Sequence, residues 1–171
     1  VFMKEADDPF RAADQAVEFL KAQGVKVIFV DFHAETTAEK QALAWHLDGR
    51  VSAVVGTHTH IATADARVLP GGTAFQCDAG MTGGFDSVIG MDRQAALRRF
   101  LTGLPERLTP APGDPRLNAV LIEVDGVTGK ALSIRPIEMA HVSSGTASTR
   151  ARLLSGAEAA AAVRARVRTG V

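Results

Sequence analysis

The chain has 171 residues, of which 46% are apolar and 22% are charged, and its 19 basic and 19 acidic residues leave a formal net charge of zero. This composition fits one globular domain with a hydrophobic core, and the balanced charge gives no indication of binding to nucleic acid or anionic membranes. No apolar run reaches the roughly 18 residues that a membrane-spanning helix needs. A single cysteine, Cys77, excludes an internal disulfide and fits a reducing compartment, so we expect a cytoplasmic protein.

The first segment, VFMKEADDPF, is acidic and lacks both an initiator methionine and a long apolar stretch, so it does not resemble a signal peptide. We therefore expect the chain to be a fragment or a processed form of a longer protein. A helix is predicted from Pro9, because Asp8 is a good N-cap and proline suits the first helical turn. Apolar residues then recur at helical spacing until Gly24, which is typical of a helix C-terminus.

A strand, a helix and a second strand follow. Val25–Asp31 and Val51–Gly56 are short, β-branched apolar runs that predict buried strands, the first of them covered on both faces. Between them, Thr36 and Glu39 have the spacing of a capping box, which predicts a helix to about Leu47. Strands joined by such a crossover are parallel, and functional groups gather beyond the C-terminal ends of parallel strands.

Three of the five histidines are placed at this edge of the predicted sheet. His33 follows the first strand, and His58 and His60 follow the second. Neutral imidazoles bind zinc, iron, manganese and similar ions, so this placement favours a metal site. The alternative, that these are exposed loop histidines, stays open because an H-x-H pair is a weak motif. His46 and His141 are more simply explained as ordinary surface or hydrogen-bonded residues.

Carboxylates accompany these histidines. Asp31 and Glu35 bracket His33, where they could orient a metal-binding imidazole or could simply end the strand and lead into the helix. Asp65 and Asp78 offer the same two interpretations, and the structural one is favoured for them.

A glycine-rich loop follows a predicted hairpin. The hairpin crosses Pro70–Gly72, and Cys77 beyond it fits a buried strand position. Gly80, Gly83 and Gly84 could let the loop approach a phosphate closely, although such turns are more often only turns. No Walker lysine follows, so this is not a P-loop. We keep Gly83 as a candidate residue of a substrate loop.

The remaining sequence divides into a folded part and a tail. Asp92–Gly103 predicts an amphipathic helix, and a proline-rich loop follows it. The segments LNAVLIEVD and ALSIRPIE predict an antiparallel pair across GVTGK. The sequence then becomes linker-like and finally Ala/Arg-rich. We therefore divide the chain into a domain over residues 1–140 and a tail over residues 141–171.

Several of these motifs together resemble those of a known family. DFHAE, GTHTH, LPGGTA and GMTG…DSVIG, in this order and spacing, are similar to the YmdB-like metallophosphoesterases, a bacterial branch of the calcineurin-like superfamily. Members are described as 2′,3′-cyclic-nucleotide phosphodiesterases, and the resemblance covers about residues 1–138. It implies an α/β fold, the calcineurin-like metallophosphoesterase sandwich with αββα layers, with an incomplete N-terminal half.

The resemblance also implies a site for two divalent metal ions, iron or manganese by expectation and zinc as an alternative. His33 and His58 would bind the second ion and His60 the first. In the family, the two ions hold phosphate oxygens while a bridging hydroxide attacks phosphorus. The family's other site residues, its catalytic histidine included, precede the segment that matches this chain, so we assign no catalytic residue here. We therefore expect the isolated chain to bind metal weakly and to have little activity.

The expected partner is a small cyclic nucleotide or other phosphodiester, with no membrane and no sequence-specific nucleic acid, and we expect a homo-oligomer. The main alternative is a catalytically inactive fragment that acts as a structural or oligomerisation module through an exposed sheet edge. A 2H phosphoesterase would need two H-x-T/S motifs, and only His141–Ser143 fits. An amidohydrolase barrel would need repeated βα units, for which the chain is too short.

Overall fold

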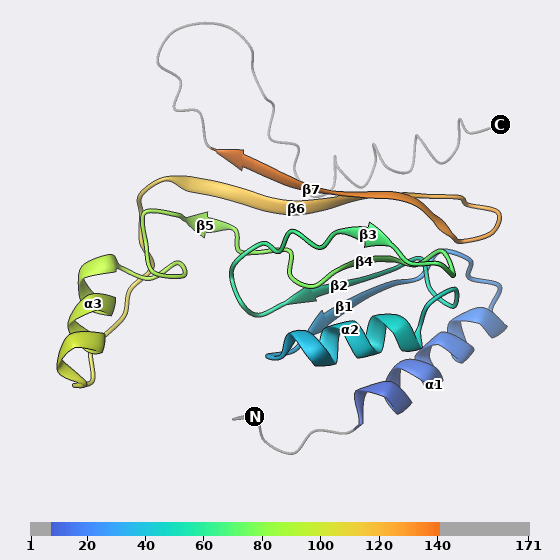
Figure 1. The fold of residues 1–171 in the computed structure, drawn as a ribbon, viewed down its shortest axis with the longest axis horizontal. Helices are drawn as coiled ribbons and strands as arrows, with labels where there is room; N and C mark the ends of the chain where they lie inside the picture. The colour runs from blue at the N-terminus through green and yellow to red at the C-terminus, as the bar shows by residue number, and fades with distance from the viewer. Residues whose placement is uncertain (1–7, 141–171) are drawn as a thin grey trace, which may run out of the picture. The chain divides into compact units, whose positions relative to one another are not determined.

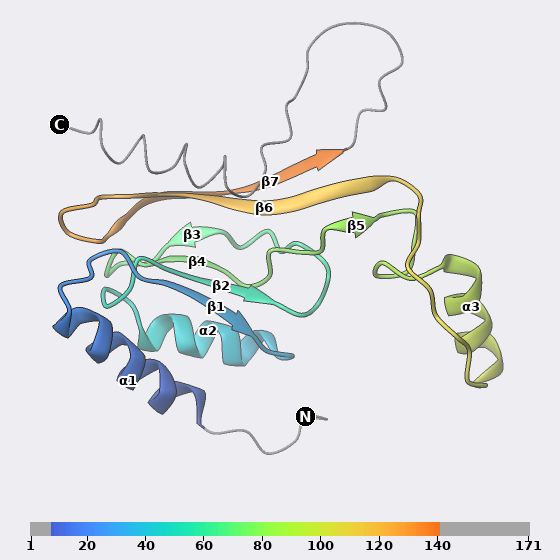
Figure 2. The same cartoon turned by 180° about the vertical axis from the view of Figure 1, so that it is seen from behind.

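The computed structural model describes residues 8–140 and shows two sheets (Figures 1 and 2). The first has the order β1-β2-β4-β3, in which β1, β2 and β4 are parallel and β3 is antiparallel to β4. Its strands are β1 (Phe29–His33), β2 (Ala53–Thr57), β3 (Arg67–Val68) and β4 (Ala74–Gln76). The second sheet is antiparallel, with the order β5-β6-β7. Its strands are β5 (Gly83–Gly84), β6 (Pro115–Val124) and β7 (Ala131–Ala140).

Three helices accompany the sheets, and each begins directly after a capping residue. They are α1 (Pro9–Ala22), α2 (Thr37–His46) and α3 (Arg93–Thr102). The side chains of Asp8, Thr36 and Asp92 accept backbone hydrogen bonds at the three N-termini. Helices α1 and α2 cover one face of the first sheet, and β6 and β7 lie against its other face (Figures 1 and 2). The result is a mixed α/β fold with helix, sheet and sheet layers.

The main core fills the space between the two helices and the first sheet. Its buried side chains are Val17, Ile28, Leu43, Ala44, Leu47, Val51, Val54, Leu69, Phe75 and Cys77. Strand β2 is buried over Ala53–Gly56, as the apolar run predicts. A smaller cluster of alanines and isoleucines lies between the sheets, where short side chains let the two sheets approach each other.

Strand β1 differs from the sequence prediction. It begins at Phe29 rather than Val25, extends to His33, and alternates between exposed and half-buried side chains instead of being covered on both faces. The physical reason is its position at the edge of the sheet. Val30 and Phe32 face the helices, whereas the second sheet contacts β3 and β4 through β7 and leaves the Phe29 face open.

The other predicted elements are confirmed with one change. The hairpin across Pro70–Gly72 forms as β3 and β4, and the late antiparallel pair forms as β6 and β7. Within the predicted glycine-rich loop, however, Gly83–Gly84 form a short strand, β5, that pairs with β6. The predicted tail over residues 141–171 lies outside the described residues. Within residues 8–140, no helix is both long and apolar enough to cross a membrane.

Candidate metal centre

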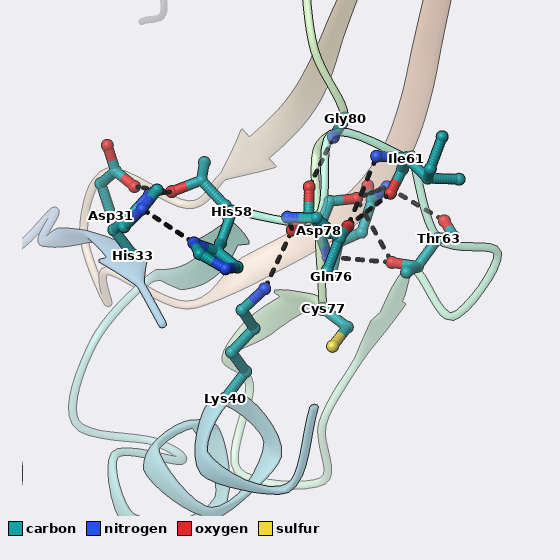
Figure 3. Close-up of polar contacts among 12 residues, drawn as sticks. Asp31, His33, Lys40, His58, Ile61, Thr63, Gln76, Cys77, Asp78 and Gly80 are labelled. Atoms are coloured by element: carbon teal, nitrogen blue, oxygen red, sulfur yellow. Dashed lines mark hydrogen bonds and ion pairs between the residues drawn. The ribbon is translucent and has the colours of Figure 1, made fainter. Parts of the chain in front are cut away.

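Two of the three predicted metal ligands meet at the C-terminal ends of β1 and β2 (Figure 3). His33 is the last residue of β1, and His58 follows directly after β2. The two strands are parallel and in register, so their ends share one edge. Nε2 of His33 lies 3.1 Å from Nδ1 of His58, and the two rings meet edge to face with centroids 5.0 Å apart. The βαβ topology therefore places these two imidazoles together, as expected.

The other ring nitrogen of His33 is held by a short polar chain. The Thr57 hydroxyl donates to Asp31 Oδ1 at 3.4 Å, so it accepts the Nδ1–H of His33, at 3.0 Å. This tautomer leaves a lone pair on Nε2, the nitrogen that faces His58. Asp31 thus acts on His33 through Thr57, in the manner of a carboxylate that orients a ligand imidazole. Glu35 is half-buried in the turn between β1 and α2.

His60 is oriented separately. Its Nδ1–H donates to the Ile89 carbonyl oxygen at 2.8 Å, which also leaves a lone pair on Nε2. In the part of the chain that the structure describes, no three His, Cys, Asp or Glu side chains are grouped closely enough to hold a metal ion. The structure therefore joins His33 and His58, and the metal-binding role of all three histidines remains a prediction.

The loop that carries His58 and His60 has an unusual backbone. Their φ angles are 127° and 66°, in regions that side-chain-bearing residues rarely adopt. Each such residue costs on the order of 1–3 kcal/mol and persists only where surrounding contacts enforce it, most often at functional sites. The residue between them, Thr59, donates its backbone N–H to Asp78 Oδ2 at 2.9 Å. That contact fixes the loop between its two strained positions.

Asp78 is the centre of a buried network that anchors this loop (Figure 3). Its Oδ2 also accepts from Lys40 Nζ at 2.9 Å, and its Oδ1 accepts from Gly80 N at 2.9 Å. The Lys40 and Asp78 side chains are 0% and 1% exposed. Burial raises the pKa of Asp78, but the hydrogen bonds from Lys40, Thr59 and Gly80 outweigh it and hold that pKa below its ordinary value. The structural role favoured for Asp78 agrees with this arrangement.

The remaining candidate residues lie beside this network. Oδ1 of Asp65 accepts the backbone N–H of Cys77 at 3.1 Å, so Asp65 fixes the chain just after β4. Burial and the nearby Asp65 raise the pKa of the Cys77 thiol, which is buried as predicted. Oδ2 of Asp65 and Oε1 of Gln76 are buried without a partner among the described residues. Gly83 lies in β5, where a Cβ would meet no atom within 4 Å, and its substrate-loop role stays a prediction.

Lys40 supports the histidine loop through Asp78, and the sequence did not single it out. It lies on α2, and nothing in TAEKQALAWH marks its lysine as buried. Its partner is 38 positions further along the chain, so the contact becomes visible only when β4 is placed beside β2. The chain makes room for this lysine with Gly56, where a Cβ would lie 2.7 Å from Lys40 Cδ and 1.9 Å from the Cys77 carbonyl oxygen.

Fold and site together define a class: a layered α/β protein that presents imidazoles at the C-terminal ends of parallel strands. The family model described as YmdB-like protein matches residues 1–137, and the chain belongs to this family. It is 52% identical over 136 residues to the 2′,3′-cyclic-nucleotide 2′-phosphodiesterase of Bacillus subtilis (strain 168). That match covers 80% of this chain and 51% of the relative.

Two crystal structures are similar in fold. One is a hypothetical protein from Thermus thermophilus, with a TM-score of 0.76 and 45% identity over 82% of this chain and 54% of the other. The second is a structure described as a novel phosphatase of Mycoplasma pneumoniae, with a TM-score of 0.73 and 36% identity over 80% of this chain and 48% of the other. The chain spans about half the length of each of these relatives.

Proposed function

We propose that this chain supplies histidine ligands to a dinuclear metal site in a calcineurin-like phosphodiesterase that hydrolyses 2′,3′-cyclic nucleotides or related phosphodiesters. The observation that carries the proposal is the pair of imidazole nitrogens, His33 Nε2 and His58 Nδ1, 3.1 Å apart at the sheet edge. The chain that holds this pair is 52% identical to a protein named as a 2′,3′-cyclic-nucleotide phosphodiesterase.

The spacing of the two nitrogens fits a shared metal ion. Imidazole nitrogens about 2.1 Å from one ion, at angles between right-angled and tetrahedral, lie roughly 3.0–3.4 Å from each other. The observed 3.1 Å falls in this interval, and it is also a hydrogen bond in which Nδ1–H of His58 donates to Nε2 of His33, so a shared ion would have to displace that proton. Imidazoles suit iron, manganese and zinc. They are neutral donors, however, so carboxylates in addition to these histidines are needed to balance two divalent ions.

Bound ions would polarise the phosphodiester and supply a hydroxide nucleophile near neutral pH. The chain's own residues prepare the ligands. Asp31 and Thr57 keep Nδ1 of His33 protonated, and the Ile89 carbonyl does the same for His60. Both rings therefore present an unprotonated Nε2 without a change of tautomer.

Metal titration of the full 171-residue chain tests the site. Isothermal titration calorimetry with Mn²⁺ should show binding that weakens by roughly tenfold or more in H33A and H58A, since each loses a ligand nitrogen. H46A is the matched control, because His46 is bound to Asp14 at 2.9 Å, away from the sheet edge. Turnover of 2′,3′-cAMP is measured on the same samples. Equal Mn²⁺ affinity in all four proteins would refute the metal site.

A second candidate function is a non-catalytic module that forms homo-oligomers. Among the described residues, β1 is an edge strand, and Phe29 on it is 55% exposed. On α3, Phe100 and Leu101 are 80% and 83% exposed. Light scattering after size-exclusion chromatography should then show an oligomer that F29E or F100E dissociates. A monomeric chain that binds Mn²⁺ and hydrolyses 2′,3′-cAMP would contradict this candidate.

A further inference from the structure

A cavity of about 260 Å³ lies at the edge of the first sheet opposite to the histidines. Three segments line it: the end of α1 with the turn after it (residues 21–26), the turn before β2 (residues 49–51) and the β6–β7 turn (residues 128–130). In Figure 1 these segments lie at the end of the sheet away from the arrowheads of β1 and β2. The cavity is therefore separate from the candidate metal centre.

The lining of this cavity is strongly cationic. Four of its residues are Lys21, Lys26, Arg50 and Lys130, and in the described chain no acidic residue lines it. The whole sequence has zero formal net charge, so this is a local concentration of charge rather than a general basic character. A concave site lined by one sign of charge attracts ions of the opposite sign.

The positions of the lysines in the chain also show that positive charge is concentrated at this cavity. The sequence contains five lysines. Lys40 is buried against Asp78, and Lys4 lies outside the described residues. All three of the others meet in this one cavity, although they come from α1, from the turn after it and from the β6–β7 turn.

The acidic groups near these segments already have partners, and two of them, Asp14 and Glu18, pair with Arg50 of the cavity wall, so the charge argument rests on the three lysines. Asp48 accepts backbone hydrogen bonds from Gly71 and Thr73. Asp125 accepts backbone hydrogen bonds within the β6–β7 turn, which hold its pKa below the ordinary value. Asp14 and Glu18 on α1 pair with Arg50. Within residues 8–140, no carboxylate forms an ion pair with any of the three cavity lysines. All three lysines are exposed to solvent, and their flexible stems let the ammonium groups reach toward an anion in the cavity.

The walls of the cavity are fixed by buried contacts. The Ser52 hydroxyl accepts from Ile28 N at 3.2 Å and donates to the Gly129 carbonyl at 2.6 Å, which joins the start of β1 to the β6–β7 turn. Gly129 has a φ of 75°, and a Cβ there would lie 2.1 Å from the Lys26 carbonyl oxygen. Only glycine permits this approach, so Lys26 and Lys130 are held close together by the backbone.

We propose that this cavity binds a small, multiply charged phosphate anion, either free or as the phosphate group of a small molecule. Its volume is slightly below the roughly 300–1,000 Å³ of pockets that enclose drug-sized ligands, so a compact anion fits better than a whole nucleotide. Lysine ammonium groups bind phosphate as point charges without a fixed fork geometry. The site lies about 13 Å or more from His33, the length of β1 at about 3.3 Å per residue.

The test uses the full chain with EDTA, so that metal-dependent phosphate binding near the histidines is suppressed. The probes are inorganic phosphate and pyrophosphate. Calorimetry gives the affinity, and backbone amide NMR shifts of Gly24, Gly49 and Gly129 locate the site. The test variant is K21Q/K26Q/K130Q, with K130Q alone as a milder form. The control R99Q/R107Q/R135Q removes three exposed positive charges elsewhere. Thermal unfolding establishes that each variant is folded.

One saturable site is expected, with shifts at the three glycine amides and affinity weakened roughly tenfold or more by the triple lysine variant. The arginine control should keep nearly the parent affinity. Stronger binding of pyrophosphate than phosphate would support a multiply charged ligand. Equal weakening in both triple variants, no saturation at about 10 mM anion, or shifts only near His33 would overturn the proposal. Lysine-dependent binding of an RNA oligonucleotide without any binding of free phosphate or pyrophosphate would also overturn it.

Discussion

Replacing Lys40 with methionine tests the buried ion pair that anchors the histidine loop. Lys40 Nζ lies 2.9 Å from Asp78 Oδ2, and both side chains are at most 1% exposed. Methionine fills most of the space of the lysine stem but leaves the carboxylate buried without its cation. Removing one partner of a buried ion pair costs roughly 3–5 kcal/mol. Since Asp78 keeps its hydrogen bonds from Thr59 and Gly80, we expect K40M to lower the free energy of unfolding by about 3 kcal/mol.

A double variant separates the charge from the packing. In K40M/D78N both charges are absent, and neutral replacement of a buried ion pair is often nearly neutral in free energy. The asparagine carbonyl can still accept one of the two backbone hydrogen bonds. We therefore expect K40M/D78N to recover about half or more of the stability lost in K40M.

Urea unfolding followed by far-ultraviolet circular dichroism measures these differences, provided that the transition is two-state. K21M is the matched control, because Lys21 is exposed on α1 and should change the free energy of unfolding by less than about 0.5 kcal/mol. A loss below about 1 kcal/mol in K40M, or a double variant no more stable than K40M, would refute the assignment of a strongly coupled buried pair.

Three further predictions concern the same structure. The folded-state pKa of Asp78 is below its ordinary 3.8, so the carboxylate stabilises the fold above about pH 4 and loses this contribution as the pH falls through the folded-state pKa. The urea midpoint of the parent should therefore fall more steeply below about pH 4 than the midpoint of D78N. S52A should cost about 1–3 kcal/mol in urea unfolding, because it leaves a buried N–H and a buried carbonyl without a partner; a change near zero would contradict the bridging role. G129A should lower the melting temperature, because its added Cβ meets the Lys26 carbonyl. G126A in the same turn has open space around its Cβ and should leave the melting temperature almost unchanged. Equal melting temperatures for the two glycine variants would contradict the close approach.

Most helix boundaries could be predicted because their signals are local. Asp8, Thr36 and Asp92 each cap a helix through a hydrogen bond to a residue two or three positions away. Gly24 and Gly103 end helices with positive φ angles that glycine adopts freely. Such contacts are encoded in four or five consecutive residues, so the sequence alone is enough to place them.

The boundaries and burial of β1 could not be predicted in the same way. VKVIFVD contains enough apolar residues for a strand covered on both faces, but coverage depends on which elements lie next to it. Because β1 is at the sheet edge and the second sheet contacts β3 and β4, Phe29 and Asp31 are exposed. An apolar run indicates how many side chains a strand could bury, and the neighbouring strands and helices determine how many are buried in the fold.

The sequence predicts the part of the candidate site that the order of strands and helices determines. Parallel strand ends bring His33 beside His58, and this follows from the βαβ pattern alone. His60 also lies at this edge in the sequence pattern, but its ring is oriented by the Ile89 carbonyl, 29 positions away, in a turn with a positive φ at Ile89 itself. No local rule indicates a contact of that range.

The conformation of the loop that contains His58 and His60 depends on the buried Lys40–Asp78 pair more than on the GTHTH motif itself. Histidine adopts positive φ more often than most side-chain-bearing residues, but neither His58 nor His60 is a glycine, and two such positions together cost on the order of 2–6 kcal/mol. The compensating contact comes from Asp78, whose carboxylate binds the Thr59 backbone at its centre and is itself neutralised by Lys40 from below the sheet. A surface carboxylate would exchange that hydrogen bond with water, since exposed polar contacts contribute little net free energy. Because Lys40 and Asp78 are enclosed, the imidazoles are positioned by the same core that stabilises the fold.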